Sequence, residues 1–204
     1  MNYQTEQEKF WATDFGNDYP RRNQGEQLIS ANVAIFSKIL ENCPSVNSIA
    51  ELGCNIGLNL IALNRINKNH KLRGYEINAK AAQEAKNQNI AEIINTTVAE
   101  HLDSSVKFDL TFTKGVLIHI NPEKLAEVYQ NLFNLSSKYI LVYEYYNPTP
   151  MAIEYRGHEG VLFKRDFAGE LIDKFNLKLI DYGFTYNREK YFPKDDGTWF
   201  LLEK

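Results

Sequence analysis

Strand-like runs of apolar residues alternate with helix-like segments from Val46 to the end of the chain. Strands that alternate with helices build a parallel sheet with helices on both faces, so this pattern predicts the α/β class. We expect seven strands, at residues 46–52, 71–77, 92–98, 107–113, 139–145, 177–184 and 198–204.

The connections between these strands predict that the sheet is mostly parallel. Residues 57–67 have apolar side chains at helical spacing, and Pro122 stands where the first turn of a helix over 123–133 tolerates proline. No helix fits between the last two strands, because residues 185–197 are turn-forming and charged. We therefore expect these two strands to form an antiparallel terminal hairpin.

The 204 residues fit one globular unit. An aromatic and polar stretch at 10–24 and a predicted helix at 25–43 precede the sheet. We expect residues 1–45 to form an N-terminal helical cap over a domain of residues 46–204. Residues 1–25 are expected to act as a lid that becomes ordered when ligand binds.

Composition excludes several classes of function. A net charge of −3 gives no basic footprint for nucleic acid, so we expect a small-molecule substrate. Two cysteines and four scattered histidines predict no disulfide framework and no metal site. We expect a cytoplasmic protein without membrane contact, because the chain has no signal peptide and no long apolar span. The sequence does not indicate an oligomeric state.

The turn after the first strand, "ELGCNIGLN", occupies the position that lines the ligand crevice in open α/β sheets. Its spacing departs from the dinucleotide pattern G-x-G-x-x-G, since Asn55 places a side chain where a pyrophosphate would pack. Glu51 adds a negative charge nearby. The turn therefore favours a ligand with an ammonium group and no phosphate, such as S-adenosyl-L-methionine (SAM). A helix-entry turn with an exposed glutamate is the alternative.

A second acid follows at the end of the next strand. Glu76 lies in "GYEIN" and matches the acid that binds ribose hydroxyls in nucleotide-binding βαβ units. Two acids at the ends of consecutive strands strengthen the prediction of a nucleoside ligand.

With these motifs, and with "VAEHL" and "FDLTFTKGVLIHI", the chain from about residue 46 onward resembles the class I SAM-dependent methyltransferases. The resemblance implies a Rossmann-like fold that ends in a reversed hairpin. It also implies a set of cofactor-binding residues: Glu51, Gly53, Asn55 and Gly57 at the methionine end, Glu76 and Ile77 at the ribose, Ala99 and Glu100 near the adenine, and Lys114 near the methionine group. Asn55 and Asn59 stand where glycine is commoner in that family.

A narrower resemblance rests on "FWATDFGNDYPRRN", "YNPTPMAIEYRGHEGVLFKRDFAGE" and "DYGFTYNREKYFPKDDGTWFLLEK". These stretches are similar to the pseudaminic-acid-biosynthesis-associated methylases, which implies a sugar substrate of the nonulosonic-acid type. The resemblance also implies that Tyr19 and Arg22 reach the cofactor from the cap.

Two residues are candidates for a general base in methyl transfer. His119 follows the fourth strand in "GVLIHINP", and Glu144 ends the apolar fifth strand, where burial would raise its pKa. A histidine held only by backbone hydrogen bonds is the alternative for His119.

The candidates for acceptor binding lie after the fifth strand. Tyr145 could form an aromatic wall, although tyrosine also packs well in strands. Arg156 and His158 lie in a cationic insertion that could bind a carboxylate or phosphate, or could be a solvated basic face.

Two other functional classes remain open at this point. One is a nicotinamide-dependent oxidoreductase on a similar sheet, against which the missing middle glycine argues. The other is a non-catalytic module that keeps the cofactor pocket within a sugar pathway.

Overall fold

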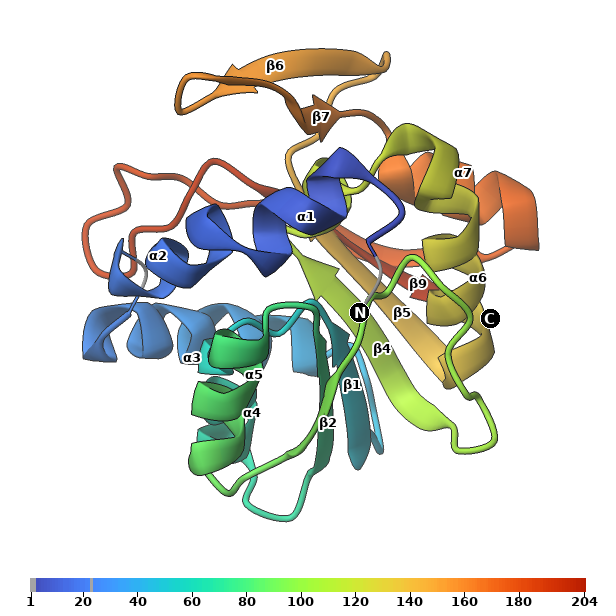
Figure 1. Ribbon diagram of the computed structural model, residues 1–204. Helices are drawn as coiled ribbons and strands as arrows, with labels where there is room; N and C mark the ends of the chain where they lie inside the picture. Colours follow the sequence, from blue (N-terminus) through green and yellow to red (C-terminus); the bar gives the residue numbers. More distant parts are fainter. Residues whose placement is uncertain (1–2, 23) are drawn as a thin grey trace.

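Seven strands form one central sheet in the computed structural model, which describes residues 3–22 and 24–204 (Figure 1). Their order across the sheet is β3-β2-β1-β4-β5-β9-β8. Neighbouring strands are parallel except β9, which is antiparallel to both β5 and β8. The strands are β1 (Ser48–Leu52), β2 (Lys71–Glu76), β3 (Glu92–Asn95), β4 (Phe108–Lys114), β5 (Ser136–Glu144), β8 (Lys178–Phe184) and β9 (Thr198–Glu203).

All seven predicted strands are present, and the antiparallel terminal hairpin is confirmed. The central strands are buried on both faces, which is why they read as continuous apolar runs in the sequence. The third strand is shorter than the predicted 92–98, because pairing with β2 ends at Asn95. The Thr96 amide donates to the carbonyl of Glu76, and the chain then leaves the sheet.

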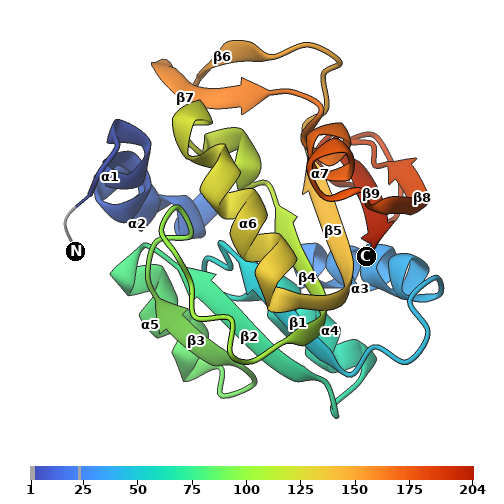
Figure 2. The ribbon, with the colours of Figure 1, turned by 90° about the vertical axis from the view of Figure 1, so that its right-hand side faces the viewer.

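Helices cover both faces of the sheet (Figures 1 and 2). Helices α3, α4 and α5 pack on one face, and α6 and α7 pack on the other. The predicted helices over 25–43, 57–67 and 123–133 are present, with a short 3-10 turn at Pro122–Lys124 before α6. The helices are α3 (Glu26–Leu40), α4 (Leu58–Ile66), α5 (Ala79–Asn87), α6 (Leu125–Leu135) and α7 (Phe167–Phe175).

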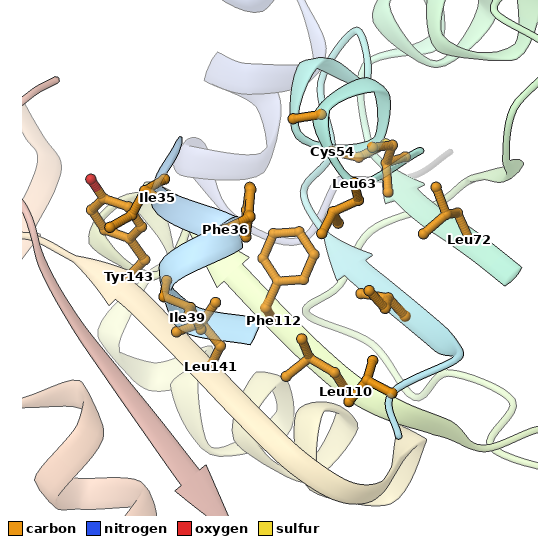
Figure 3. Close-up of a cluster of buried hydrophobic side chains, with 14 of the residues drawn as sticks. Ile35, Phe36, Ile39, Cys54, Leu63, Leu72, Leu110, Phe112, Leu141 and Tyr143 are labelled. Atoms are coloured by element: carbon orange, nitrogen blue, oxygen red, sulfur yellow. The ribbon is translucent and has the colours of Figure 1, made fainter. Parts of the chain in front are cut away.

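Aromatic and aliphatic side chains join α3 to the sheet beneath the glycine turn. The rings of Phe36 from α3 and Phe112 from β4 meet with their centroids 5.3 Å apart (Figure 3). Cys54 of the turn is 2% exposed and packs into the same cluster. This packing fixes the turn from below, and it makes Cys54 a core residue.

A second, two-stranded sheet was not predicted. Strands β6 (Met151–Tyr155) and β7 (His158–Lys164) pair antiparallel and lie beyond the carboxyl ends of the central strands (Figure 1). Arg156 and Gly157 form their turn, and both have positive φ, 51° and 81°. Most side chains of this hairpin are exposed, so its sequence lacks the apolar alternation by which a strand is recognised.

Two short helices, α1 (Glu6–Ala12) and α2 (Asp14–Arg22), lie near the same end of the sheet (Figure 1). A capping box between Thr5 and Glu8 starts α1. The side-chain amide of Asn78, after β2, donates to the Trp11 carbonyl at 3.2 Å and to Asn17 Oδ1 at 3.1 Å. The described part of the N-terminal segment is therefore helical and attached to the sheet, while its expected ordering by ligand stays a prediction.

We predict that Gly74→Ala lowers the free energy of unfolding by about 1–3 kcal/mol. A Cβ at this position of β2 would lie 2.6 Å from Cys54 Sγ and 2.9 Å from Leu60 Cδ1, both of which are buried. Urea unfolding measures the effect, and Glu84→Ala on the exposed face of α5 is the control. Equal stability of the two variants would contradict this packing.

Candidate functional site

A cavity of about 560 Å³ opens at the carboxyl ends of the central strands. Its wall contains residues from the turn after β1, the tips of β2, β4 and β5, and the segment 96–99 after β3. Helices α1, α2 and α3, the loop after β4, the β6–β7 turn and the β8–β9 loop also contribute to the wall. This is the edge at which open α/β sheets bind ligands.

The turn after β1 adopts a tight left-handed geometry. Gly53, Asn55 and Gly57 have φ angles of 80°, 50° and 84°, and asparagine is one of the few side chains that tolerate this region. A Cβ on Gly53 would lie 2.5 Å from a methyl group of Val116, so the turn contacts the loop after β4 directly. Gly53 and Asn55 line the cavity, whereas Gly57 lies outside its lining as the N-cap of α4.

Glu76 connects the first two loops in the cavity wall. Its Oε2 accepts from the Asn55 amide and its Oε1 from the Asn78 amide, each at 2.7 Å. Burial raises the pKa of this carboxyl group, although these backbone donors oppose the shift. The residue is 8% exposed and lines the cavity, as do Ile77 and Ala99.

Glu51 lies deeper than the sequence analysis expected. It is fully buried and outside the cavity lining, because β1 runs through the centre of the sheet between β2 and β4. Its Oε1 accepts from Asn59 Nδ2 at 2.5 Å, and its Oε2 has no hydrogen-bond donor among the described residues. Burial raises the pKa of Glu51 to about 8, with Lys114 opposing the shift. Both Asn59 and Lys114 line the cavity.

The side chain of Glu100 is placed outside the cavity. It is exposed, and its Oε1 accepts from the side-chain amide of Gln4 at 2.7 Å. Glu8 provides a deeper contact at this end of the cavity, since its Oε1 accepts from Thr97 Oγ1 at 2.5 Å. Both contacts connect the start of the chain to the segment after β3.

His119 stands where four segments meet. Its Nδ1 lies 2.7 Å from the carbonyl of Val161 in β7, which can only accept, so the proton is on Nδ1. Its ring lies 4.5 Å from Trp11 and 5.2 Å from Tyr155, measured between centroids. Burial lowers the pKa of His119 to about 4, which keeps the ring neutral. The arrangement leaves Nε2 as an acceptor on a residue that lines the cavity.

Glu144 lies in the cavity wall with both oxygens engaged by the backbone. Its Oε1 accepts from the amides of Val116 and Leu117 at 3.1 Å, and its Oε2 accepts from Ile118 at 3.4 Å. These donors begin the 3-10 turn Leu117–His119, so Glu144 fixes the segment that carries His119. Burial raises the pKa of Glu144 to about 7.

The structure separates the expected acceptor-binding residues. Tyr145 and Arg156 line the cavity, with the Arg156 guanidinium 5.7 Å from the Tyr155 ring centre. His158 lies outside the lining and contacts the ring of Phe10 at 5.0 Å. Arg156 lies in the turn with a positive φ, whereas His158 is the first residue of β7, so the two side chains do not share one strand face.

Of the two cap residues expected at the cofactor, Tyr19 lines the cavity. The side chain of Arg22 lies outside the described residues, although its backbone belongs to α2.

Several lining residues were not identified from the sequence. They come from α1, from α3 and from the β8–β9 loop, which the sequence analysis read only as turn and charge. The narrower resemblance includes Trp11 and the residues of the β8–β9 loop, whereas the lining residues at positions 5–8 and in α3 lie outside its stretches. They are Thr5, Gln7, Glu8, Trp11, Leu28, Asn32, Asn187, Pro193, Lys194, Asp195 and Gly197.

Two features are absent from the described ranges, 3–22 and 24–204. No group of three or more histidine, cysteine, aspartate or glutamate side chains there could hold a metal ion. No helix within these ranges is long and apolar enough to cross a lipid bilayer.

The chain matches no protein-family model and no curated protein. Solved structures do match it. Magnesium protoporphyrin IX methyltransferase (ChlM) from Synechocystis PCC 6803 with bound SAM has a TM-score of 0.68 at 16% identity, over 100% of both chains. DesVI from Streptomyces venezuelae has a TM-score of 0.67 at 11% identity, over 93% of this chain and 98% of that one. A SAM-dependent methyltransferase from Clostridium acetobutylicum has a TM-score of 0.66 at 13% identity, over 93% and 96%. The sheet is therefore the Rossmann-like methyltransferase fold.

We predict that Glu51→Gln flattens the pH dependence of stability. The pKa of Glu51 in the folded protein, about 8, exceeds its ordinary value of 4.5, so its contribution to stability is full below pH 4.5 and is lost as pH rises through 8. When the pH is raised from 5 to 8.5, the free energy of unfolding of the variant should increase by at least about 1 kcal/mol relative to that of the unchanged protein.

Urea unfolding at both pH values measures this gain. Glu84→Gln, an exposed carboxylate on α5, is the control. Parallel pH profiles for Glu51→Gln and the unchanged protein would contradict a buried, uncompensated carboxyl group.

Proposed function

We propose that this protein is a SAM-dependent methyltransferase that acts on a small polar molecule. One observation supports this proposal above the others: Glu76 lies in the cavity wall between the turn at Asn55 and the segment 96–99. A carboxylate at this position suits the two hydroxyls of a ribose. The Rossmann-like fold, shared with solved structures that contain SAM, supports the same cofactor.

A buried polar atom near the turn fits the amino-acid end of SAM. Asn59 lines the cavity, and its Oδ1 is an acceptor that has no donor within the described part of the chain. An ammonium group supplies the donor that this atom lacks. A pyrophosphate would bring further acceptors to the same place, which argues against a nicotinamide dinucleotide.

The chain's own residues suit methyl transfer to a polar acceptor. Bound SAM would supply an electrophilic methyl group on sulfur. His119, with its proton held on Nδ1 by Val161, presents Nε2 to accept the proton of an acceptor hydroxyl as the methyl group is transferred. Glu144 positions His119 through the backbone amides at the start of its turn, and it is the second candidate for the base because it lines the same cavity. Trp11 and Tyr155 cover the histidine ring and exclude water.

The acceptor pocket is formed by Tyr145, Tyr155, Arg156 and the cap. Arg156 is exposed and can pair with an anionic group, while the aromatic rings provide faces for a ring-shaped molecule. These features are compatible with an acidic sugar of the nonulosonic type, for which the support is the resemblance of residues 10–23, 146–170 and 181–204. We infer a cytoplasmic location from the cysteine content, since two cysteines give no disulfide framework. We also propose that residues 1–45 form a cap, because α1 and α3 contribute to the cavity wall.

We predict that S-adenosylhomocysteine (SAH) binds with micromolar affinity and that Glu76→Gln weakens it by about tenfold or more. The glutamine side chain is uncharged and has one acceptor oxygen, so it cannot accept hydrogen bonds from both ribose hydroxyls as a carboxylate does. Isothermal calorimetry measures both affinities, with Glu84→Gln as the control. No heat with folded, unchanged protein would contradict the proposal, and fluorescence enhancement of NADH on mixing would support an oxidoreductase instead.

We predict that incubation with methyl-labelled SAM and a metabolite extract yields a product with one added labelled methyl group. His119→Asn should lower the rate by about a hundredfold, as expected for loss of a general base, with SAH affinity changed less than about twofold. Mass spectrometry follows the product, and calorimetry follows SAH. Binding without any product across extracts would indicate a non-catalytic cofactor-binding module.

A further inference from the structure

Two lysines from distant parts of the sequence line the cavity close to the glycine turn. Lys114 ends β4 and Lys194 lies in the β8–β9 loop. The ammonium groups repel one another, and this repulsion adds to burial in lowering the pKa of Lys194 to about 7. Burial also lowers the pKa of Lys114, while attraction to Glu51 opposes that shift. Two ammonium groups that share a cavity favour an anion between them.

Lys194 is held in place by a buried neutral residue. Its Nζ donates to Asn32 Oδ1 at 2.5 Å, and Asn32 belongs to α3 and is 4% exposed. An amide fixes the position of an ammonium group without neutralising its charge. The contact therefore orients a cation and leaves its charge for another partner.

The acids are divided unequally between the two lysines. Glu51, Asp195 and Glu144 all attract Lys114, whereas Asp195 is the acid that attracts Lys194, and it is exposed. Lys194 is therefore the less compensated cation at this end of the cavity, where Asn59 Oδ1 is an acceptor without a donor among the described residues.

We propose that Lys194, oriented by Asn32 and assisted by Lys114, binds the carboxylate of the cofactor's amino-acid end. This inference rests on the proposed function, since it assigns one end of the SAM site. The zwitterion of an amino acid matches the arrangement: its carboxylate pairs with the lysines, and its ammonium group lies toward Asp195 and Asn59. The β8–β9 loop is far from the glycine turn along the chain, and through Lys194 it becomes part of the cofactor site.

The test compares two ligands that differ only at that end. SAH has the amino-acid group, whereas 5′-methylthioadenosine keeps the adenosine and the sulfur but lacks the carboxylate and the ammonium group. Calorimetry on the full chain should show Lys194→Gln weakening SAH by about tenfold, with 5′-methylthioadenosine changed by less than about twofold. Lys194→Arg should recover most of the SAH affinity, because it restores the cation.

Lys190→Gln is the matched control, because Lys190 lies in the same loop with its ammonium group over the Tyr191 ring. A loss of affinity for both ligands in Lys194→Gln would overturn the inference, since it would indicate general damage to the pocket. Unchanged SAH affinity would also overturn it and would leave Lys194 to an acidic acceptor. Absence of SAH binding by the unchanged protein would instead refute the proposed function itself.

Discussion

The carboxylate of Glu76 holds together the loops from which the cavity is built. It is buried, and a buried charge is costly unless hydrogen bonds compensate it. Two backbone amides do so, one from the glycine turn after β1 and one from Asn78 after β2. Asn78 then caps α5 and donates to Trp11 and Asn17 of the N-terminal helices. A continuous chain of hydrogen bonds thus leads from the tip of β2 to the cap, so a ligand that engages Glu76 acts on a group to which the cap is already coupled.

The sequence predicted the strands well because the burial of each strand is recorded in its own residues. Strands such as β1 and β5 are buried on both faces and read as apolar runs, and charged turn residues at 185–197 identified the terminal hairpin. The β6–β7 hairpin was missed because water, not a core, covers most of its side chains. Helix α5 left a weak signal for a related reason: its buried stripe consists of the alanines Ala81, Ala82 and Ala85. Periodicity reports burial, and it is faint where small or exposed residues form an element.

The two acids that suggested a cationic nucleoside have different environments. Glu76 is reached from the cavity, whereas Glu51 lies beneath it with one oxygen lacking a donor. The spacing along the chain placed both at strand ends and could not give their depth, which depends on the strands at either side. Nor could the sequence bring Lys194 and Asn32 together, because 162 positions separate them. The charge balance of the cavity is therefore a tertiary property, set by which polar groups the backbone already satisfies.

The chemical state of His119 is set mainly by segments outside the central sheet, namely α1, β6 and β7. The hydrogen bond that fixes its proton comes from β7, and the rings that bury it belong to α1 and to β6. Only the start of its turn is set by the central sheet, through Glu144 at the end of β5. Because β6, β7 and α1 lie outside that sheet, the fold alone determines neither the tautomer nor the pKa of this histidine. Substitutions in these three segments can therefore change which acceptor binds and how its proton is removed. The hydrogen bonds of Glu76 and the glycine turn would stay intact.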